Sequence, residues 1–127
     1  MDPLESKIFL SDHDILRKHI YKVTGLDRDK FDLEALRASE WSPEFERLQR
    51  NRLIIGALRY GLLGDLEKPN WDRVSRAKEL WCDYEKTGNL ECLVDAANMA
   101  MLEYVEGRHP NRHFNAVDDG DHTKIKD

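Results

Sequence analysis

The sequence is poor in cysteine and has no long hydrophobic run, and each shortage excludes a class of protein. Its two cysteines, Cys82 and Cys92, stand ten residues apart, which is not a zinc-binding pattern, and we expect both to be reduced thiols. No apolar segment approaches the length that spans a bilayer. The amino terminus, MDPLESKIFL, carries acidic residues where a secretory signal has basic ones. We therefore expect a cytoplasmic protein that contacts no membrane.

The chain also lacks an excess of basic charge. Residues 1–63 hold 11 basic and 11 acidic side chains, whereas residues 64–127 hold 9 and 14, so the second half supplies the whole formal net charge of −5. A protein that binds duplex DNA is normally basic, so duplex DNA is disfavoured as a partner. With 127 residues, 40% of them hydrophobic, the chain is long enough for one soluble domain with its own core. A local cationic pocket remains compatible with this composition.

Helical periodicity with start and stop signals runs through most of the chain, and we find no convincing strand or repeat. A first helix is expected from Ser11 to Gly25, and a short one begins near Asp32. Three long helices follow: one from Pro43, behind a Ser42 cap, to about Tyr60, one from an Asn70 cap to about Lys86, and one from an Asn89 cap to Gly107. The sequence therefore predicts an all-α fold. It is a small helical bundle of three long helices plus one or two short helices over residues 1–107, followed by a polar C-terminal tail over residues 108–127.

The long helix that begins at Pro43 carries two arginines and a glycine on one flank. Arg52, Gly56 and Arg59 are three to seven residues apart and therefore share a side of the helix. Two guanidinium groups around a residue without a side chain can seat a phosphate or a carboxylate. Alternatively, the arginines pair with acids of a neighbouring helix, and Gly56 permits close helix packing. The residues expected to form the core stripe of this helix are Ile54, Ile55, Leu58 and Leu62.

The last two helices offer four carboxylates. The final helix is apolar around much of its circumference and is interrupted by Glu91, Asp95 and Asn98, while the preceding helix offers Glu79 and Asp83. If residues 86–89 form the turn of an antiparallel hairpin, the two pairs of acids come level and can converge on Mg²⁺, which prefers oxygen ligands. The alternative for Glu79 and Asp83 is that they simply face water. Asp95 and Asn98 stand in a very apolar helix, and for them a functional role or a buried polar network is weighed against exposure at the surface.

One helix resembles a known family. The segment LECLVDAANMAMLEY is similar to a helix of MazG-like, all-α nucleoside triphosphate pyrophosphohydrolases, in which an acid and an aspartate precede "AN" and apolar residues. In that family four carboxylates from two helices bind Mg²⁺, and the enzyme cleaves between the α and β phosphates. The resemblance implies that Glu91 and Asp95 are metal ligands and that Asn98 is a nearby polar contact. Glu79 and Asp83 are four residues apart, where the family has two glutamates three apart.

A longer pattern, from RNRLIIGALRYG through TGNLECLVDAANMAMLEYVEGRHPNRHF, resembles small proteins encoded by bacteriophages, which would place the chain in a bacterial host cell.

The C-terminal tail, residues 108–127, is rich in imidazole and carboxylate groups. Such a cluster can bind a transition metal, and a polar tail of this kind can equally be mobile. The residues concerned are His109, His113, Asp118, Asp119, Asp121 and His122.

Two functions are compatible with these patterns. In the first, the protein binds a nucleotide or another phosphorylated small molecule through Arg52 and Arg59, with Mg²⁺ held by the carboxylates. It then hydrolyses the ligand, or sequesters it if the carboxylate set is incomplete. Sequestering a host signalling nucleotide is a coherent purpose for a phage protein. In the second, it is a helical protein-interaction module without enzymatic activity, which binds a host protein or a second copy of itself as a homo-oligomer. Its candidate anchors are Trp41, Trp71, Trp81 and Tyr104.

Overall fold

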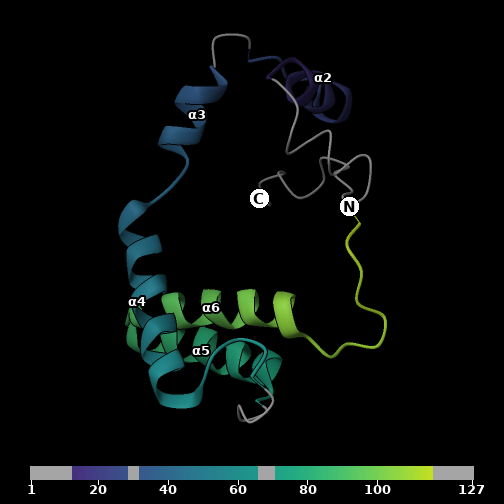
Figure 1. Cartoon of the computed structure of the whole chain (residues 1–127). Coiled ribbons are helices and arrows are strands. Elements are labelled where there is room, and N and C mark those ends of the chain that lie inside the picture. Colours follow the sequence, from purple (N-terminus) through teal and green to yellow (C-terminus); the bar gives the residue numbers. More distant parts are fainter. Residues whose placement is uncertain (1–12, 29–31, 66–70, 116–127) are drawn as a thin grey trace. The chain divides into compact units, whose positions relative to one another are not determined.

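The computed structural model describes residues 13–28, 32–65 and 71–115, which form helices joined by short connections (Figure 1). The five helices in these ranges are α2 (His13–Thr24), α3 (Leu33–Ser39), α4 (Pro43–Tyr60), α5 (Arg73–Thr87) and α6 (Glu91–Glu106). The all-α class is therefore confirmed, and the three expected long helices are α4, α5 and α6. No helix of the described ranges is long and apolar enough to cross a membrane.

Local capping explains where the long helices begin and end. The hydroxyl of Ser42 accepts a hydrogen bond of 3.0 Å from the backbone N–H of Phe45, and Pro43 occupies the first turn of α4, as expected. Helix α4 ends at Gly61, whose φ of 107° suits a residue without a side chain. Helix α5 begins later than expected, because its cap is Asp72 and not Asn70, which lies outside the described residues.

The turn between α5 and α6 is tight. Gly88 ends α5 in the left-handed conformation with a φ of 71°, and its backbone N–H donates to the carbonyl of Tyr84. Leu90 occupies the cap position of α6, and the side-chain oxygen of Asn89 accepts a 3.0 Å hydrogen bond from the N–H of Glu91. Asn89 therefore satisfies one backbone donor at the start of this helix, but the expectation that it is the cap residue is wrong, because Leu90 occupies that position.

The chain divides into two compact units. The first, the terminal unit, combines residues 1–41 with residues 113–127 and contains α2 and α3. Within it, the guanidinium of Arg17 donates to both carboxylate oxygens of Asp27, at 2.6 and 3.2 Å. The second, the helical unit, runs from Ser42 to Arg112 and contains α4, α5 and α6. The expected division into a bundle of residues 1–107 and a tail of residues 108–127 stays a prediction.

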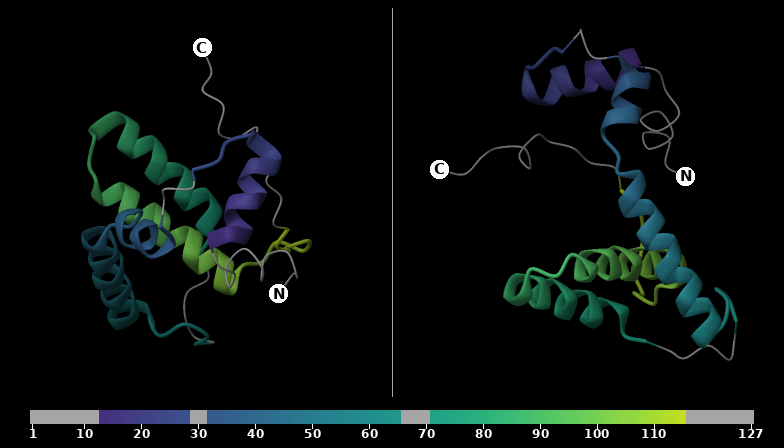
Figure 2. Two further views of the ribbon diagram at one scale, coloured as in Figure 1. Left: turned by 90° about the horizontal axis from the view of Figure 1, so that it is seen from above. Right: turned by 90° about the vertical axis from the view of Figure 1, so that its left-hand side faces the viewer.

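In the helical unit, α5 and α6 form an antiparallel hairpin and pack along each other, while α4 packs on α6 (Figures 1 and 2). The described apolar side chains that are buried are few: Leu80 of α5 and Val94 and Ala96 of α6. Helix α6 therefore lies at the centre of the unit, as its apolar sequence predicts, and it contacts both of the other helices.

The expected core stripe of α4 is wrong. Ile54, Ile55, Leu58 and Leu62 are 57%, 41%, 85% and 70% exposed. Helix α4 turns a different side toward α6, where Gln49 and Arg52 make polar contacts and Leu53 is half-buried. A helix advances about 100° per residue, so the expected stripe lies mostly on the side away from α6. The polar contacts of Gln49 and Arg52 with α6 decide which side of α4 faces α6, and no local sequence pattern reveals them.

A second polar contact anchors the connection between α4 and α5. The guanidinium of Arg73, a buried residue, donates to the carbonyl of Leu102 at 3.2 Å and to Oε1 of Glu106 at 2.8 Å. Oε2 of Glu106 accepts a 2.8 Å hydrogen bond from the backbone N–H of Gly64. One carboxylate at the end of α6 therefore holds both the start of α5 and the segment that follows α4.

Candidate functional site

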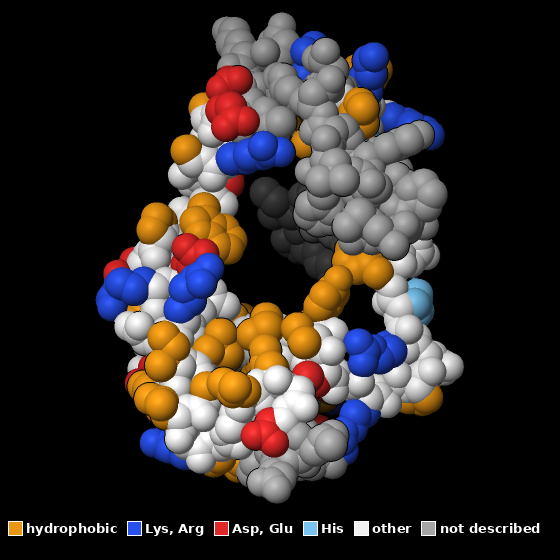
Figure 3. Space-filling model, viewed as in Figure 1, with side chains coloured by type: hydrophobic (Ala, Val, Ile, Leu, Met, Phe, Trp, Pro, Cys, Tyr) orange, Lys and Arg blue, Asp and Glu red, His pale blue; other side chains and the backbone are white. Residues whose placement is uncertain are grey.

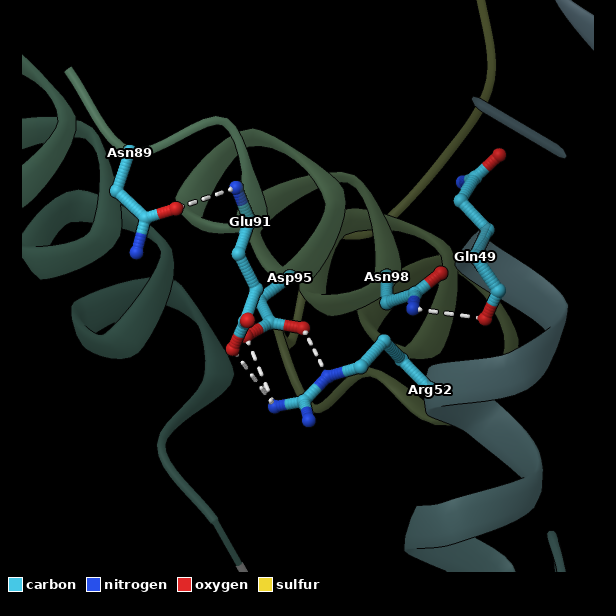
Figure 4. Close-up of polar contacts among 6 residues, drawn as sticks. All are labelled: Gln49, Arg52, Asn89, Glu91, Asp95 and Asn98. Carbon is cyan, nitrogen blue, oxygen red and sulfur yellow. Dashed lines mark hydrogen bonds and ion pairs between the residues drawn. The ribbon is translucent and has the colours of Figure 1, made fainter. Parts of the chain in front are cut away.

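Four of the seven predicted site residues lie together where α4 meets α6 (Figure 4). The Nε and Nη2 atoms of Arg52 donate to the two carboxylate oxygens of Asp95 at 3.0 and 3.1 Å. Nη2 also lies 3.5 Å from Oε1 of Glu91, one helical turn earlier on α6. We call Arg52, Glu91 and Asp95 the Arg52 cluster. For Arg52, the interpretation that it pairs with acids of a neighbouring helix is therefore confirmed.

Asn98, the fourth of the predicted residues that lie here, connects the same two helices. Its side-chain Nδ2 donates to the backbone carbonyl of Gln49 at 3.1 Å, and the residue is only 3% exposed. Its Oδ1 is buried and has no hydrogen-bond partner among the described residues. Since the amide nitrogen is engaged with α4, the placement of Asn98 supports the packing of α4 on α6 more directly than contact with a ligand. The carbonyl of Gln49 could not have been found from sequence, because any residue supplies one.

The electrostatics of the cluster favour a permanently charged arginine. Its hydrogen bonds to Asp95, and then the negative charges of Asp95 and Glu91, raise the pKa of Arg52 above its usual value. One cation and two carboxylates leave the cluster with one excess negative charge. The Arg52 side chain is 42% exposed and the Asp95 side chain 20%, so water reaches the ion pair. Pairs exposed to this extent contribute roughly 0–1 kcal/mol to stability.

The other two predicted carboxylates do not join the cluster. Glu79 lies 3.0 Å from the guanidinium of Arg76 on its own helix, and Asp83 is exposed. Helix α5 buries Leu80 and Arg73, so its packed side excludes Glu79. Among the residues that the structure describes, no three His, Cys, Asp or Glu side chains form a group that could hold a metal ion. The structure therefore brings together two of the four carboxylates, both of them from α6.

The glycine between the two arginines has open space where a side chain would lie. A Cβ atom built on Gly56 would meet no other side chain or distant backbone atom within 4 Å, so close helix packing does not explain this glycine. Arg59 lies with its guanidinium carbon 5.8 Å from the centre of the Tyr60 ring. The flank of α4 from Arg52 to Arg59 thus carries two arginines with open space beside Gly56, and a phosphate seat there stays a prediction.

The histidine-rich tail is described only in part. His109 accepts a hydrogen bond of 3.0 Å at Nδ1 from the backbone N–H of Asn111, and Arg112 donates to the carbonyls of Tyr104 and Gly107. These contacts attach the first residues of the tail to the end of α6. The predicted acidic members, Asp118, Asp119 and Asp121, and also His122, lie outside the described residues.

Sequence reasoning missed the contact between Arg73 and Glu106. These two residues are 33 positions apart, and neither belongs to a recognisable motif. The one signal was an arginine in the first turn of a helix, where a cation is unfavourable next to the positive end of the helix dipole and therefore needs a partner.

Comparison of the chain with protein-family models, with curated proteins and with solved structures finds no match in any of the three. The described residues therefore define an all-α protein with a three-helix unit. Its function has to be inferred from its own residues, because no matching protein supplies one.

Proposed function

We propose that the helical unit binds a nucleotide or another phosphorylated small molecule at the Arg52 cluster, together with Mg²⁺. The observation that carries this proposal is the convergence of Arg52 with Glu91 and Asp95, which lie 39 and 43 positions away in the sequence. These residues combine one phosphate-binding fork with two carboxylates, which are the two kinds of group that a phosphate–Mg²⁺ pair needs.

The residues present fit a partly hydrated ion. Mg²⁺ in nucleotide sites is commonly bound by one or two carboxylates, with water and phosphate oxygens completing its shell. Glu91 and Asp95 would supply those carboxylates. Arg52 would then turn its guanidinium from Asp95 to a phosphate, a geometry that its planar fork matches. Because the exposed pair contributes only roughly 0–1 kcal/mol, exchanging its partner costs little.

Arg59 adds a second guanidinium group to the flank of α4 that carries Arg52. It lies seven residues beyond Arg52, which is about 10 Å along a helix axis. This spacing suits a ligand with separated anionic groups, such as a nucleotide, better than a single phosphate ion. The open space beside Gly56 lies between the two arginines.

We propose binding without turnover, in other words sequestration. The MazG-like chemistry implied by the resemblance needs four carboxylates from two helices, and here Glu79 is paired with Arg76. Two carboxylates can hold Mg²⁺ against a phosphate, but both are then metal ligands and no further carboxylate remains to activate the attacking water. A phage protein that removes a host signalling nucleotide would need only the first of these abilities.

Thermal unfolding against nucleoside triphosphates, cyclic nucleotides and NAD derivatives, with and without Mg²⁺, tests this proposal. A ligand at 100 times its dissociation constant adds about 2.7 kcal/mol to the stability of the protein. The shift should disappear in Arg52→Ala and Asp95→Asn and weaken in Arg59→Ala. It should persist in the control Arg47→Ala, which removes another exposed, ion-paired arginine from α4.

The result is decisive in either direction. If no ligand of the panel shifts the midpoint, or if Arg52→Ala shifts as much as the wild type, the phosphate site is wrong. Chromatography of the ligand after incubation separates the two forms of the proposal, because an intact ligand indicates sequestration and a cleaved one indicates hydrolysis.

A second candidate function is favoured by a different observation. Three tryptophans and a tyrosine are at least half exposed: Trp41, Trp71, Trp81 and Tyr104. Large aromatic side chains at the surface are typical anchors of protein interfaces, so the chain would be an interaction module for another protein, such as a host protein. A photoreactive side chain in place of Trp81 should then cross-link a partner in cells, whereas the same group in place of Lys78, an exposed neighbour on α5, should not.

A further inference from the structure

The C-terminal end of α4 carries an aromatic ring that pairs with a second ring and with an arginine. The rings of Tyr60 and Trp71 lie edge to face, with their centres 5.2 Å apart and their planes at 67°. The guanidinium carbon of Arg59 lies 5.8 Å from the centre of the Tyr60 ring, which is within the range of a cation–π contact. Arginine and aromatic side chains are the groups on which proteins stack nucleobases.

The aromatic pair keeps part of its ring surface open to a ligand. An edge-to-face contact covers at most one face of each ring, and Trp71 is 50% exposed while Tyr60 is 38% exposed. Figure 3 shows hydrophobic side chains gathered over the lower part of α4, which is the half that ends at Tyr60. Such surroundings suit the flat face of an aromatic ring, which is released from water when it stacks.

The pair also lies on the same side of α4 as the Arg52 cluster. Arg52, Gly56 and Tyr60 follow one another at intervals of four residues, so they line one side of the helix over about 12 Å. Gly56 stands between the other two, and the space where its side chain would lie is open. At this position no side chain separates the arginine from the aromatic pair.

We propose that the ligand of the Arg52 cluster is a nucleotide whose base stacks on Trp71 beside Tyr60, while its phosphates reach Arg52. This rests on the proposed function, since it names what fills the other end of the same site. It narrows the class of ligand, because a sugar phosphate or an inorganic polyphosphate has no ring to stack. Every base has a π face, so the site accepts all four bases and binds the larger rings of the purines most tightly.

Calorimetric titration of the full chain with ATP, GTP, CTP or UTP in the presence of Mg²⁺ tests the stacking. Inorganic tripolyphosphate is titrated in parallel, because it carries the phosphate chain without a base and reports the phosphate end alone. Trp71→Ala should weaken the binding of the nucleoside triphosphates roughly 5- to 150-fold, the usual effect of losing one base–aromatic contact, and should leave tripolyphosphate binding unchanged. Trp71→Phe, which keeps a ring, should retain most of the affinity. The control Trp81→Ala removes a tryptophan of similar exposure, 55%, from α5 and should bind all probes as the wild type does.

Fluorescence tests the same contact without removing the ring. A variant with Trp41→Phe and Trp81→Phe keeps Trp71 as its single tryptophan. Its emission should be quenched when GTP stacks on the indole and should not change when tripolyphosphate binds. Emission that GTP leaves unchanged, although calorimetry shows that it binds, overturns the stacking.

The remaining outcomes separate this proposal from the proposed function. If Arg52→Ala abolishes the binding of the nucleoside triphosphates and Trp71→Ala does not weaken it, the phosphate site stands and the stacking is overturned. Trp71 is then free to anchor a protein partner. Wild-type protein that binds tripolyphosphate as tightly as ATP and GTP overturns the stacking as well. If no nucleoside triphosphate and no tripolyphosphate binds, both proposals fail together.

Discussion

Replacing Arg73 by leucine removes a buried cation and leaves its partner carboxylate behind. Arg73 is 9% exposed, while the Glu106 side chain, which accepts its hydrogen bond at 2.8 Å, is 24% exposed. Breaking a fully buried ion pair on one side costs about 3–5 kcal/mol. Since water reaches a quarter of Glu106 and the N–H of Gly64 still donates to it, we expect the free energy of unfolding to fall by roughly 2–3 kcal/mol.

Urea unfolding followed by circular dichroism measures this loss as a lower midpoint with an unchanged slope. The matched control is Arg76→Leu, which breaks the exposed pair with Glu79 on the same helix and should cost less than about 1 kcal/mol. Adding Glu106→Gln to Arg73→Leu should recover part of the loss, because the remaining group is then uncharged. If Arg73→Leu costs no more than Arg76→Leu, the argument from burial is refuted.

Three further predictions concern single positions. Gly56→Ala should raise the stability by about 1 kcal/mol in urea unfolding, since the added Cβ meets open space inside a helix; a loss would show that the glycine is needed for packing. Gly88→Ala should lower it by about 1–2 kcal/mol, because alanine is strained at a φ of 71°, and an unchanged midpoint would contradict this. The N–H and hydroxyl of Ser75 lower the pKa of Asp72, so the cap stabilises the protein above the ordinary carboxyl pKa of about 3.9 and loses this effect as the pH falls through the lowered value. Asp72→Asn should therefore flatten the acid side of the stability–pH curve, and an identical curve would exclude the cap as its cause.

The sequence identified Arg52, Glu91, Asp95 and Asn98, which the structure brings together, but not the contacts among them, and it added Glu79 and Asp83, which lie elsewhere. Arg52 and Asp95 were each identified from their own helix, as a cation beside a glycine and as an acid in an apolar helix. That one binds the other follows only from the packing of α4 on α6, over 43 positions of sequence. The packing of α5 on α6 buries Leu80 and leaves Glu79 outside the cluster, because a shift of one residue along a helix turns a side chain by about 100°.

The existence of the long helices and both ends of α4 were determined by the sequence alone. Ser42 and Gly61 act on backbone groups three or four residues away, so the signal and its effect lie in the same short segment. The orientation of α4 was decided only by the tertiary structure. This helix has apolar residues on more than one side, and the sequence does not rank them. The hydrogen bonds of Arg52 to Asp95 and of Asn98 to Gln49 select the side that faces α6, and they leave Ile55 and Leu58 at the surface.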